Sequence, residues 1–163
     1  MNSIFLPDIF VDTVYDIDLE ALKNEGIKGF IFDIDNTLVT YAEPIANEKI
    51  MSWLKDLRNM GFALYIVSNN DKERVKVFSE SVEIPHFGKA LKPLSYFLRK
   101  ACRGMGIKPC ETALVGDQLF TDIWGGNLLK MKTILVKPIS EVEDGFVRFK
   151  RQFERRILNK VDR

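Results

Sequence analysis

The stretch IFDIDNTLV, residues 31–39, starts as an apolar run and then places two carboxylates, Asp33 and Asp35, one residue apart. The run GFIF, residues 29–32, is short and rich in aromatic and β-branched residues, which is typical of a strand buried on both faces. Three later runs have the same character and also end at polar residues: FALYIV (62–67), ALV (113–115) and TILV (133–136). We therefore predict four buried strands, each ending where polar residues begin.

Helical patterns separate these runs. The apolar spacing and the end signals predict four helices. The first runs from Pro44 to Gly61 with Ile50, Leu54 and Leu57 inward, and the second begins at Asn70, with Glu73 in a capping box and Val75, Phe78 and Val82 inward. The third runs from Pro93 to Gly104 and Gly106 with Leu94, Phe97, Leu98 and Ala101 inward, and the fourth from Thr121 to Lys130. Strands that alternate with helices predict an α/β fold, in which a central parallel sheet carries helices on both faces. A length of 163 residues suits a single domain over residues 1–163.

The composition narrows the function classes. The net charge is +1 and apolar residues are 46%, so neither disorder nor a nonspecific nucleic-acid surface is expected. Residues 145–163 hold seven Lys/Arg against two acids, and their apolar residues follow helical spacing, which predicts a basic amphipathic C-terminal helix. That helix either docks on the sheet, which is the preferred interpretation, or lies on an anionic membrane; the apolar N-terminal segment poses the same choice.

Two further features bear on location. Cys102 and Cys110 fit neither a redox motif nor a zinc half-site and are expected to be free thiols in a reducing cytosol. We expect no signal peptide or membrane span, and a cytoplasmic protein that is peripheral at the membrane only if the basic helix binds lipid. His86 is expected in a solvated loop.

In parallel sheets, ligands bind at the carboxyl ends of the strands, so the residues that follow the strands form a candidate site. They are Asp33, Asp35, Ser68, Asn69, Asp117 and Asp122. Gathered carboxylates repel each other by ~4 kcal/mol per pair at about 4 Å and an effective dielectric near 20, so the cluster needs a cation. Hard oxygen ligands favour Mg²⁺, Lys92 supplies a second positive charge, and Asp35 can hold a proton because neighbouring carboxyls titrate together.

Four motifs carry a resemblance to a known family. DIDNT (33–37), the strand ending in Ser68-Asn69, the pair Lys92-Pro93 and GDQLFTD (116–122) resemble motifs I to IV of the haloacid dehalogenase (HAD) phosphatase superfamily. Together they cover residues 28–138 in the expected order. The N-terminal LPD segment, DIDNTLV and the ending GDQLFTDIWGGN with TILVKP are similar to YqeG-like members of HAD subfamily IIIA, which are related to the mitochondrial phosphatidylglycerophosphatases. That pattern has Arg and Gly where Leu128 and Lys130 stand here.

The resemblance implies a Mg²⁺-dependent phosphomonoester hydrolase with a Rossmann-like fold. It implies that Asp33 attacks phosphorus and forms an aspartyl-phosphate, and that Asp35 protonates the leaving oxygen and then activates water. The metal would be held by Asp33, the Asp35 carbonyl, Asp117 and Asp122. Phosphate oxygens would be positioned by Thr37, Ser68, the Asn69 backbone and Lys92.

The short spacing between motifs also predicts an enzyme without a cap domain. Residues 37–68 leave room for little beyond one helix and one strand, and residues 68–92 for one helix. An open site suits a large, polymeric or membrane-resident phosphoester, although a second copy of the chain can supply a lid. The family resemblance, together with the open site and the basic C-terminal segment, implies phosphatidylglycerophosphate as the preferred substrate. Nucleotide, sugar and phosphoprotein monoesters are the alternatives, as are a receiver-like signalling module and an interaction protein without turnover.

Overall fold

The computed structural model describes residues 4–140, and the predicted C-terminal helix over residues 145–163 lies outside them. Its centre is a six-stranded sheet in the order β1-β6-β5-β2-β3-β4, and every neighbouring pair is parallel. The strands are β1 (Ile9–Val11), β2 (Gly29–Phe32), β3 (Ala63–Val67), β4 (His86–Phe87), β5 (Thr112–Gly116) and β6 (Lys132–Val136). The four predicted strands are confirmed as β2, β3, β5 and β6.

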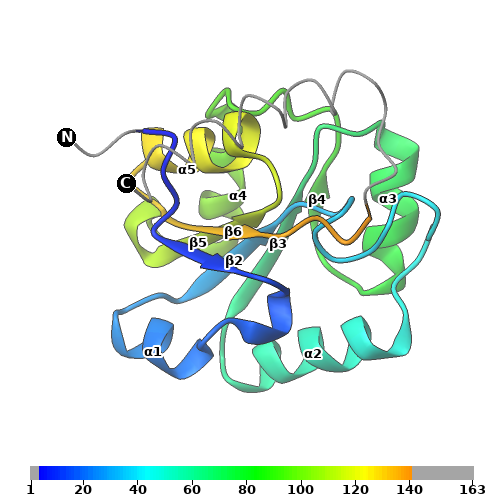
Figure 1. Ribbon diagram of the computed structural model, residues 1–163, viewed down its shortest axis with the longest axis horizontal. Coiled ribbons are helices and arrows are strands. Elements are labelled where there is room, and N and C mark those ends of the chain that lie inside the picture. Colours follow the sequence, from blue (N-terminus) through cyan, green and yellow to red (C-terminus); the bar gives the residue numbers. More distant parts are fainter. Residues whose placement is uncertain (1–3, 141–163) are drawn as a thin grey trace.

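Helices cover both faces of the sheet, as predicted (Figure 1). On one face lie α1 (Leu19–Asn24), α2 (Glu48–Asn59) and α3 (Lys72–Ser81), and on the other lie α4 (Tyr96–Met105) and α5 (Trp124–Leu128). The central strand β2 serves both layers because successive side chains of a strand point to opposite faces. Phe30 and Phe32 join the core cluster of the first face, whereas Ile31 joins that of the second.

Three predicted helix starts differ from the structure. The helix α2 starts at Glu48, where the Asn47 side chain accepts a hydrogen bond from the Ile50 amide, so Pro44 lies in the preceding loop. The cap of α3 is Asp71, whose carboxylate accepts from the Glu73 and Arg74 amides. Asn70 does not cap this helix: its carboxamide oxygen accepts from the Asp71 amide, and its carboxamide nitrogen donates to Asp35.

The third difference concerns the chain before α4. This helix starts at Tyr96 rather than at Pro93, and Leu94 is exposed rather than inward. Residues 88–95 form a loop instead, in which Lys89 and Leu91 have positive φ. The predicted C-terminal signal is confirmed, since Gly106 ends α4 in the left-handed conformation at φ 70°.

The two edge strands were not predicted. The strand β4 contains His86, so the prediction of a loop there is wrong; two residues are too few to give a periodic signal. The strand β1 pairs with β6, and the segment before it docks through Asp8, which accepts from the amide and hydroxyl of Thr133. Phe5 adds edge-on ring contacts with Phe120 and Trp124. The N-terminal segment over residues 4–11 is therefore part of the fold.

The absence of a cap domain is confirmed for the residues that the structure describes. Between β2 and α2 there is a loop, residues 33–47. Within it, a bridge between Asp35 and Val39 closes a tight turn. Between β3 and β4 there is α3 alone. Cys102 is buried and Cys110 exposed, and both are free thiols, as expected.

The chain turn after α5 yields a stability prediction. Lys130 has φ 57°, a left-handed conformation that glycine adopts without the steric cost that a Cβ brings. We expect Lys130→Gly to raise the free energy of unfolding by about 0.5–1 kcal/mol, measured by urea denaturation. Lys130→Ala is the control, because it keeps the Cβ and should give no such gain.

Candidate active site

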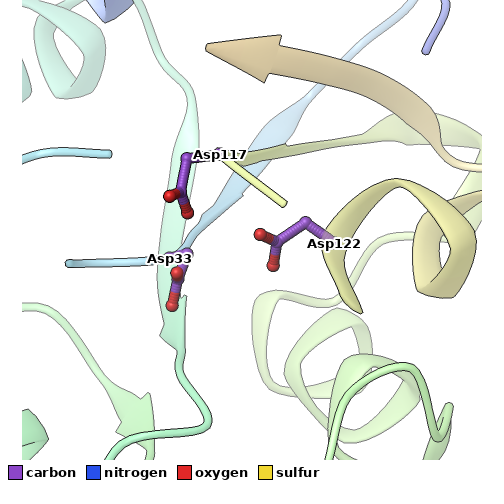
Figure 2. Close-up of side chains that lie close together, drawn as sticks. All are labelled: Asp33, Asp117 and Asp122. Carbon is purple, nitrogen blue, oxygen red and sulfur yellow. The ribbon is translucent and has the colours of Figure 1, made fainter. Parts of the chain in front are cut away.

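Asp33 and Asp117 lie side by side at the carboxyl edge of the sheet. Asp33 directly follows β2, and its amide donates to the Val115 carbonyl of β5 at 3.0 Å. Asp117 directly follows β5, which is the hydrogen-bonded neighbour of β2. Parallel pairing therefore brings together two carboxylates that are 84 residues apart in sequence, as Figure 2 shows.

Asp122 completes the cluster from a π-helical turn, Leu119–Ile123, which leads into α5. Its carboxylate folds back over the end of β5 and accepts from the Gln118 amide at 3.2 Å. Gly116 makes room for this return, because a Cβ there would overlap the Asp122 carboxylate. Asp33, Asp117 and Asp122 are all buried, and each offers an oxygen within 4.8 Å of those of the other two.

Lys92 lies inside this cluster. Its Nζ is 2.6 Å from Oδ1 of Asp122 and 3.2 Å from Oδ1 of Asp33. Burial lowers the pKa of Lys92, but the carboxylates of Asp122 and Asp33 raise it by more, so the net pKa lies above its ordinary value. The lysine is 5% exposed and carries its charge at neutral pH.

The pKa of Asp122 is also raised, but here burial is the main cause. Burial raises the pKa of its carboxyl to about 6, with Lys92 lowering it and Asp33 raising it further. With all three acids ionised, the cluster holds three carboxylates and one ammonium, or two net negative charges. A buried cluster with that imbalance is stable only with further positive charge.

Asn69 fixes the lysine. Its carboxamide oxygen accepts from the Lys92 amide at 2.7 Å, and its carboxamide nitrogen donates to the Lys92 carbonyl at 3.0 Å. This paired contact holds the backbone from which the ammonium enters the cluster. Sequence reasoning predicted Asn69 for its backbone alone and did not find this contact.

Asp35 has different partners from Asp33. Its Oδ2 accepts from the Asn70 carboxamide at 2.8 Å, and its Oδ1 pairs with the Arg74 guanidinium at 3.0 Å. Arg74 also contacts the Thr40 carbonyl at 3.4 Å, and both charged side chains are largely buried. Sequence reasoning missed Asn70 and Arg74, because both stand in what reads as an ordinary helix start.

The two hydroxyl residues lie at the same edge. Thr37 donates to Oδ1 of Asp117 at 3.4 Å, and Ser68 accepts from the Asn70 amide at 3.2 Å. Both are buried; Thr37 lies in the turn after β2, and Ser68 directly follows Val67, which ends β3. The structure thus brings all the predicted site residues to one edge of the sheet.

The donor set suits a divalent cation. Buried carboxylate oxygens from three residues are hard ligands of the kind that Mg²⁺ prefers, and two net negative charges match one such ion. Histidine and thiol groups, which favour softer metals, do not contribute to the acidic cluster within residues 4–140.

Comparisons with known proteins agree with this geometry. Residues 1–140 match the family model described as mitochondrial PGP phosphatase. A "Probable phosphatase YqeG" from Bacillus subtilis is 43% identical over all of this chain and 95% of its own length. A "Phosphatidylglycerophosphate phosphatase 1, chloroplastic/mitochondrial" from Arabidopsis thaliana is 30% identical over 87% of this chain, which spans 43% of that longer protein.

A solved structure shows the same fold. The cobalt-bound deoxy-D-mannose-octulosonate 8-phosphate phosphatase of Haemophilus influenzae superposes with a TM-score of 0.57 at 18% identity, over 78% of this chain and 77% of its own. The motifs, the acidic cluster at the sheet edge and the family match agree, and the chain belongs to the mitochondrial PGP phosphatase family of HAD-type phosphatases.

Proposed function

We propose that the protein hydrolyses phosphatidylglycerophosphate, through an aspartyl-phosphate on Asp33 and with Mg²⁺ as its metal. The observation that carries the chemistry is the buried group of Asp33, Asp117, Asp122 and Lys92 at one strand edge. The substrate rests on the family and on the plant relative, which is named for this lipid phosphate.

The metal would be held by the carboxylates of Asp33, Asp117 and Asp122 together with the carbonyl of Asp35. When bound, Mg²⁺ supplies positive charge to the phosphate oxygens and orients them for in-line attack. Lys92 supplies a second positive charge from a position fixed by Asn69. Since phosphoryl transfer depends mainly on positioning and electrostatics, this arrangement accounts for most of the catalysis.

Two half-reactions follow from the roles of the two aspartates. A carboxylate oxygen of Asp33 attacks phosphorus, the phosphorus–oxygen bond to the leaving group breaks, and Asp35 gives its proton to the departing oxygen. Asp35 then takes a proton from water as that water attacks the aspartyl-phosphate, which frees inorganic phosphate and restores Asp33. Thr37, Ser68 and the Asn69 backbone position the phosphate oxygens.

The open site supports a large substrate. No cap domain interrupts the described residues, so a phosphate that projects from a lipid surface can approach Asp33 directly. Among residues 4–140, no helix combines the length and apolar character that a membrane crossing needs. Because the site is open, we propose access from the membrane surface. The preference for lipid over nucleotide, sugar or phosphoprotein monoesters is what the first experiment tests.

The first experiment is phosphate release from a panel of lipid, nucleotide, sugar and peptide monoesters, with and without Mg²⁺. We expect metal-dependent release, fastest from phosphatidylglycerophosphate, and a loss of more than about 10³-fold in Asp33→Asn, because the nucleophile is removed. Asp56→Asn, on the exposed side of α2, is the matched control. Release confined to soluble esters would remove the lipid substrate, and an active Asp33→Asn would overturn the mechanism.

Metal binding has a readout that is independent of turnover. Mg²⁺ at about 100 times its Kd should stabilise the folded protein by about 2.7 kcal/mol, since it binds the native cluster alone. The measurement is thermal or urea unfolding with and without the metal. Asp117→Asn should lose this stabilisation while Asp56→Asn keeps it; an equal response from both variants would place the metal elsewhere.

Arg74 tests the role of Asp35. Arg74→Ala frees the carboxylate that Arg74 holds, so proton transfer to the leaving oxygen should suffer. We expect kcat to fall by ~10- to 100-fold on an alkyl phosphate and by clearly less on p-nitrophenyl phosphate, whose leaving group needs little protonation. Arg103→Ala, an exposed residue of α4, is the control. Equal losses on the two substrates would contradict a proton-transfer role for Asp35.

A further inference from the structure

Exposed apolar side chains lie close to the acidic cluster, around the carboxyl edge of the sheet, which we call the mouth of the site. Of the eleven large apolar side chains that are exposed in the described chain, five lie in the loops that follow β2, β4 and β6 near the acidic cluster or at the first residue of α4. These five are Tyr41, Leu91, Leu94, Tyr96 and Ile139. Single exposed apolar residues are common on protein surfaces, but a concentration at one functional edge indicates an interaction surface.

The loop that carries Lys92 places two leucines in solvent. Leu91 is 65% exposed and Leu94 is 61% exposed, whereas Lys92 between them is 5% exposed. The Leu94 amide donates to the Leu91 carbonyl at 2.9 Å, which closes a turn around the lysine. The same turn therefore directs the ammonium into the acidic cluster and the two leucines outward.

The backbone conformation at residue 91 bears on why a leucine stands there. Its φ is 56°, a left-handed conformation that asparagine and glycine tolerate better than leucine. Leucine at this position is unfavourable for the backbone and leaves a large apolar group in water. Neither local conformation nor core packing accounts for it, so an interaction outside the described fold is the remaining physical reason.

Ile139 extends the apolar surface to another side of the mouth. It is 52% exposed, and its amide donates at 3.2 Å to the carbonyl of Asn36, which stands between Asp35 and Thr37. An exposed lysine lies two residues before each of two apolar residues of this surface: Lys89 before Leu91, and Lys137 before Ile139. We call Leu91, Leu94 and Ile139 the apolar rim.

We propose that the apolar rim inserts into an anionic phospholipid surface while Lys89 and Lys137 contact its phosphate groups. This inference rests on the proposed function and adds the partner and the residues that bring the site to it. Apolar groups flanked by cations complement the boundary between acyl chains and anionic headgroups. Seated in this way, the site meets a lipid phosphate without extracting the lipid from the bilayer.

The experiment compares full-length wild type with the double variant Leu91→Asn/Leu94→Asn. Asparagine removes the apolar groups and suits the left-handed backbone at residue 91, so the variant should fold with an unfolding temperature no lower than wild type by more than a few degrees. Leu128→Asn is the matched control, since it removes another exposed leucine, on α5. Lys89→Gln/Lys137→Gln tests the charges.

Two quantities decide the outcome. The first is sedimentation with phosphatidylglycerol vesicles and with phosphatidylcholine vesicles. The second is the ratio of hydrolysis of vesicle-borne phosphatidylglycerophosphate to that of its soluble dihexanoyl analogue. We expect the leucine double variant to lose at least about tenfold in both, while Leu128→Asn keeps wild-type values. The lysine double variant should lose the preference for phosphatidylglycerol.

Unchanged sedimentation and an unchanged hydrolysis ratio in the leucine variant would overturn the proposal, with the basic C-terminal segment then left as the membrane contact. A change of molar mass in solution in that variant, with vesicle binding intact, would also overturn it, because the rim would then join copies of the chain. Failure of the proposed function looks different: wild type would hydrolyse neither form of the lipid, whatever its vesicle binding.

Discussion

The ion contact between Lys92 and the two carboxylates of Asp33 and Asp122 is the constraint on which the site depends. Removing one partner from a buried ion pair typically costs about 3–5 kcal/mol, because the other charge is left uncompensated. Several local features serve this contact. Asn69 clamps the lysine backbone, the missing side chain of Gly116 admits Asp122, and a π-helical turn directs Asp122 back over β5.

The same contact explains why the chain between β4 and α4 departs from helix. The Lys92 side chain reaches Asp33 and Asp122 from the chain that precedes α4. Residues 88–95 therefore form a loop with two positive-φ residues, and α4 does not begin at Pro93. That loop exposes Leu91 and Leu94 as it buries the lysine. The position of the Lys92 ammonium and the exposure of the two leucines are thus two consequences of one loop conformation.

Sequence reasoning predicted the parts of the fold that carry strong patterns. Buried strands and strand-ending acids gave the sheet, the catalytic edge and the convergence of Asp33, Asp117 and Lys92. It missed β1 and β4, because edge strands of two or three residues have no measurable period. It also assigned Asn70 to a helix cap, a role that Asp71 takes in the structure. The Asn70 carboxamide accepts from the Asp71 amide and donates to Asp35, and no local pattern encodes the contact with Asp35.

The two aspartates of IFDIDNTLV, one residue apart, have separate cations in the folded protein. Asp33 pairs with Lys92 on the loop before α4, and Asp35 pairs with Arg74 on α3. Sequence reasoning balanced the site by placing a proton on Asp35, because neighbouring carboxyls titrate together. Arg74 alters this balance, because it offsets the negative charge of Asp35. The net charge left for a metal is the negative charge of Asp33, Asp117 and Asp122 minus the positive charge of Lys92. One divalent cation then matches the charge of that cluster, while Arg74 pairs with the Asp35 carboxylate.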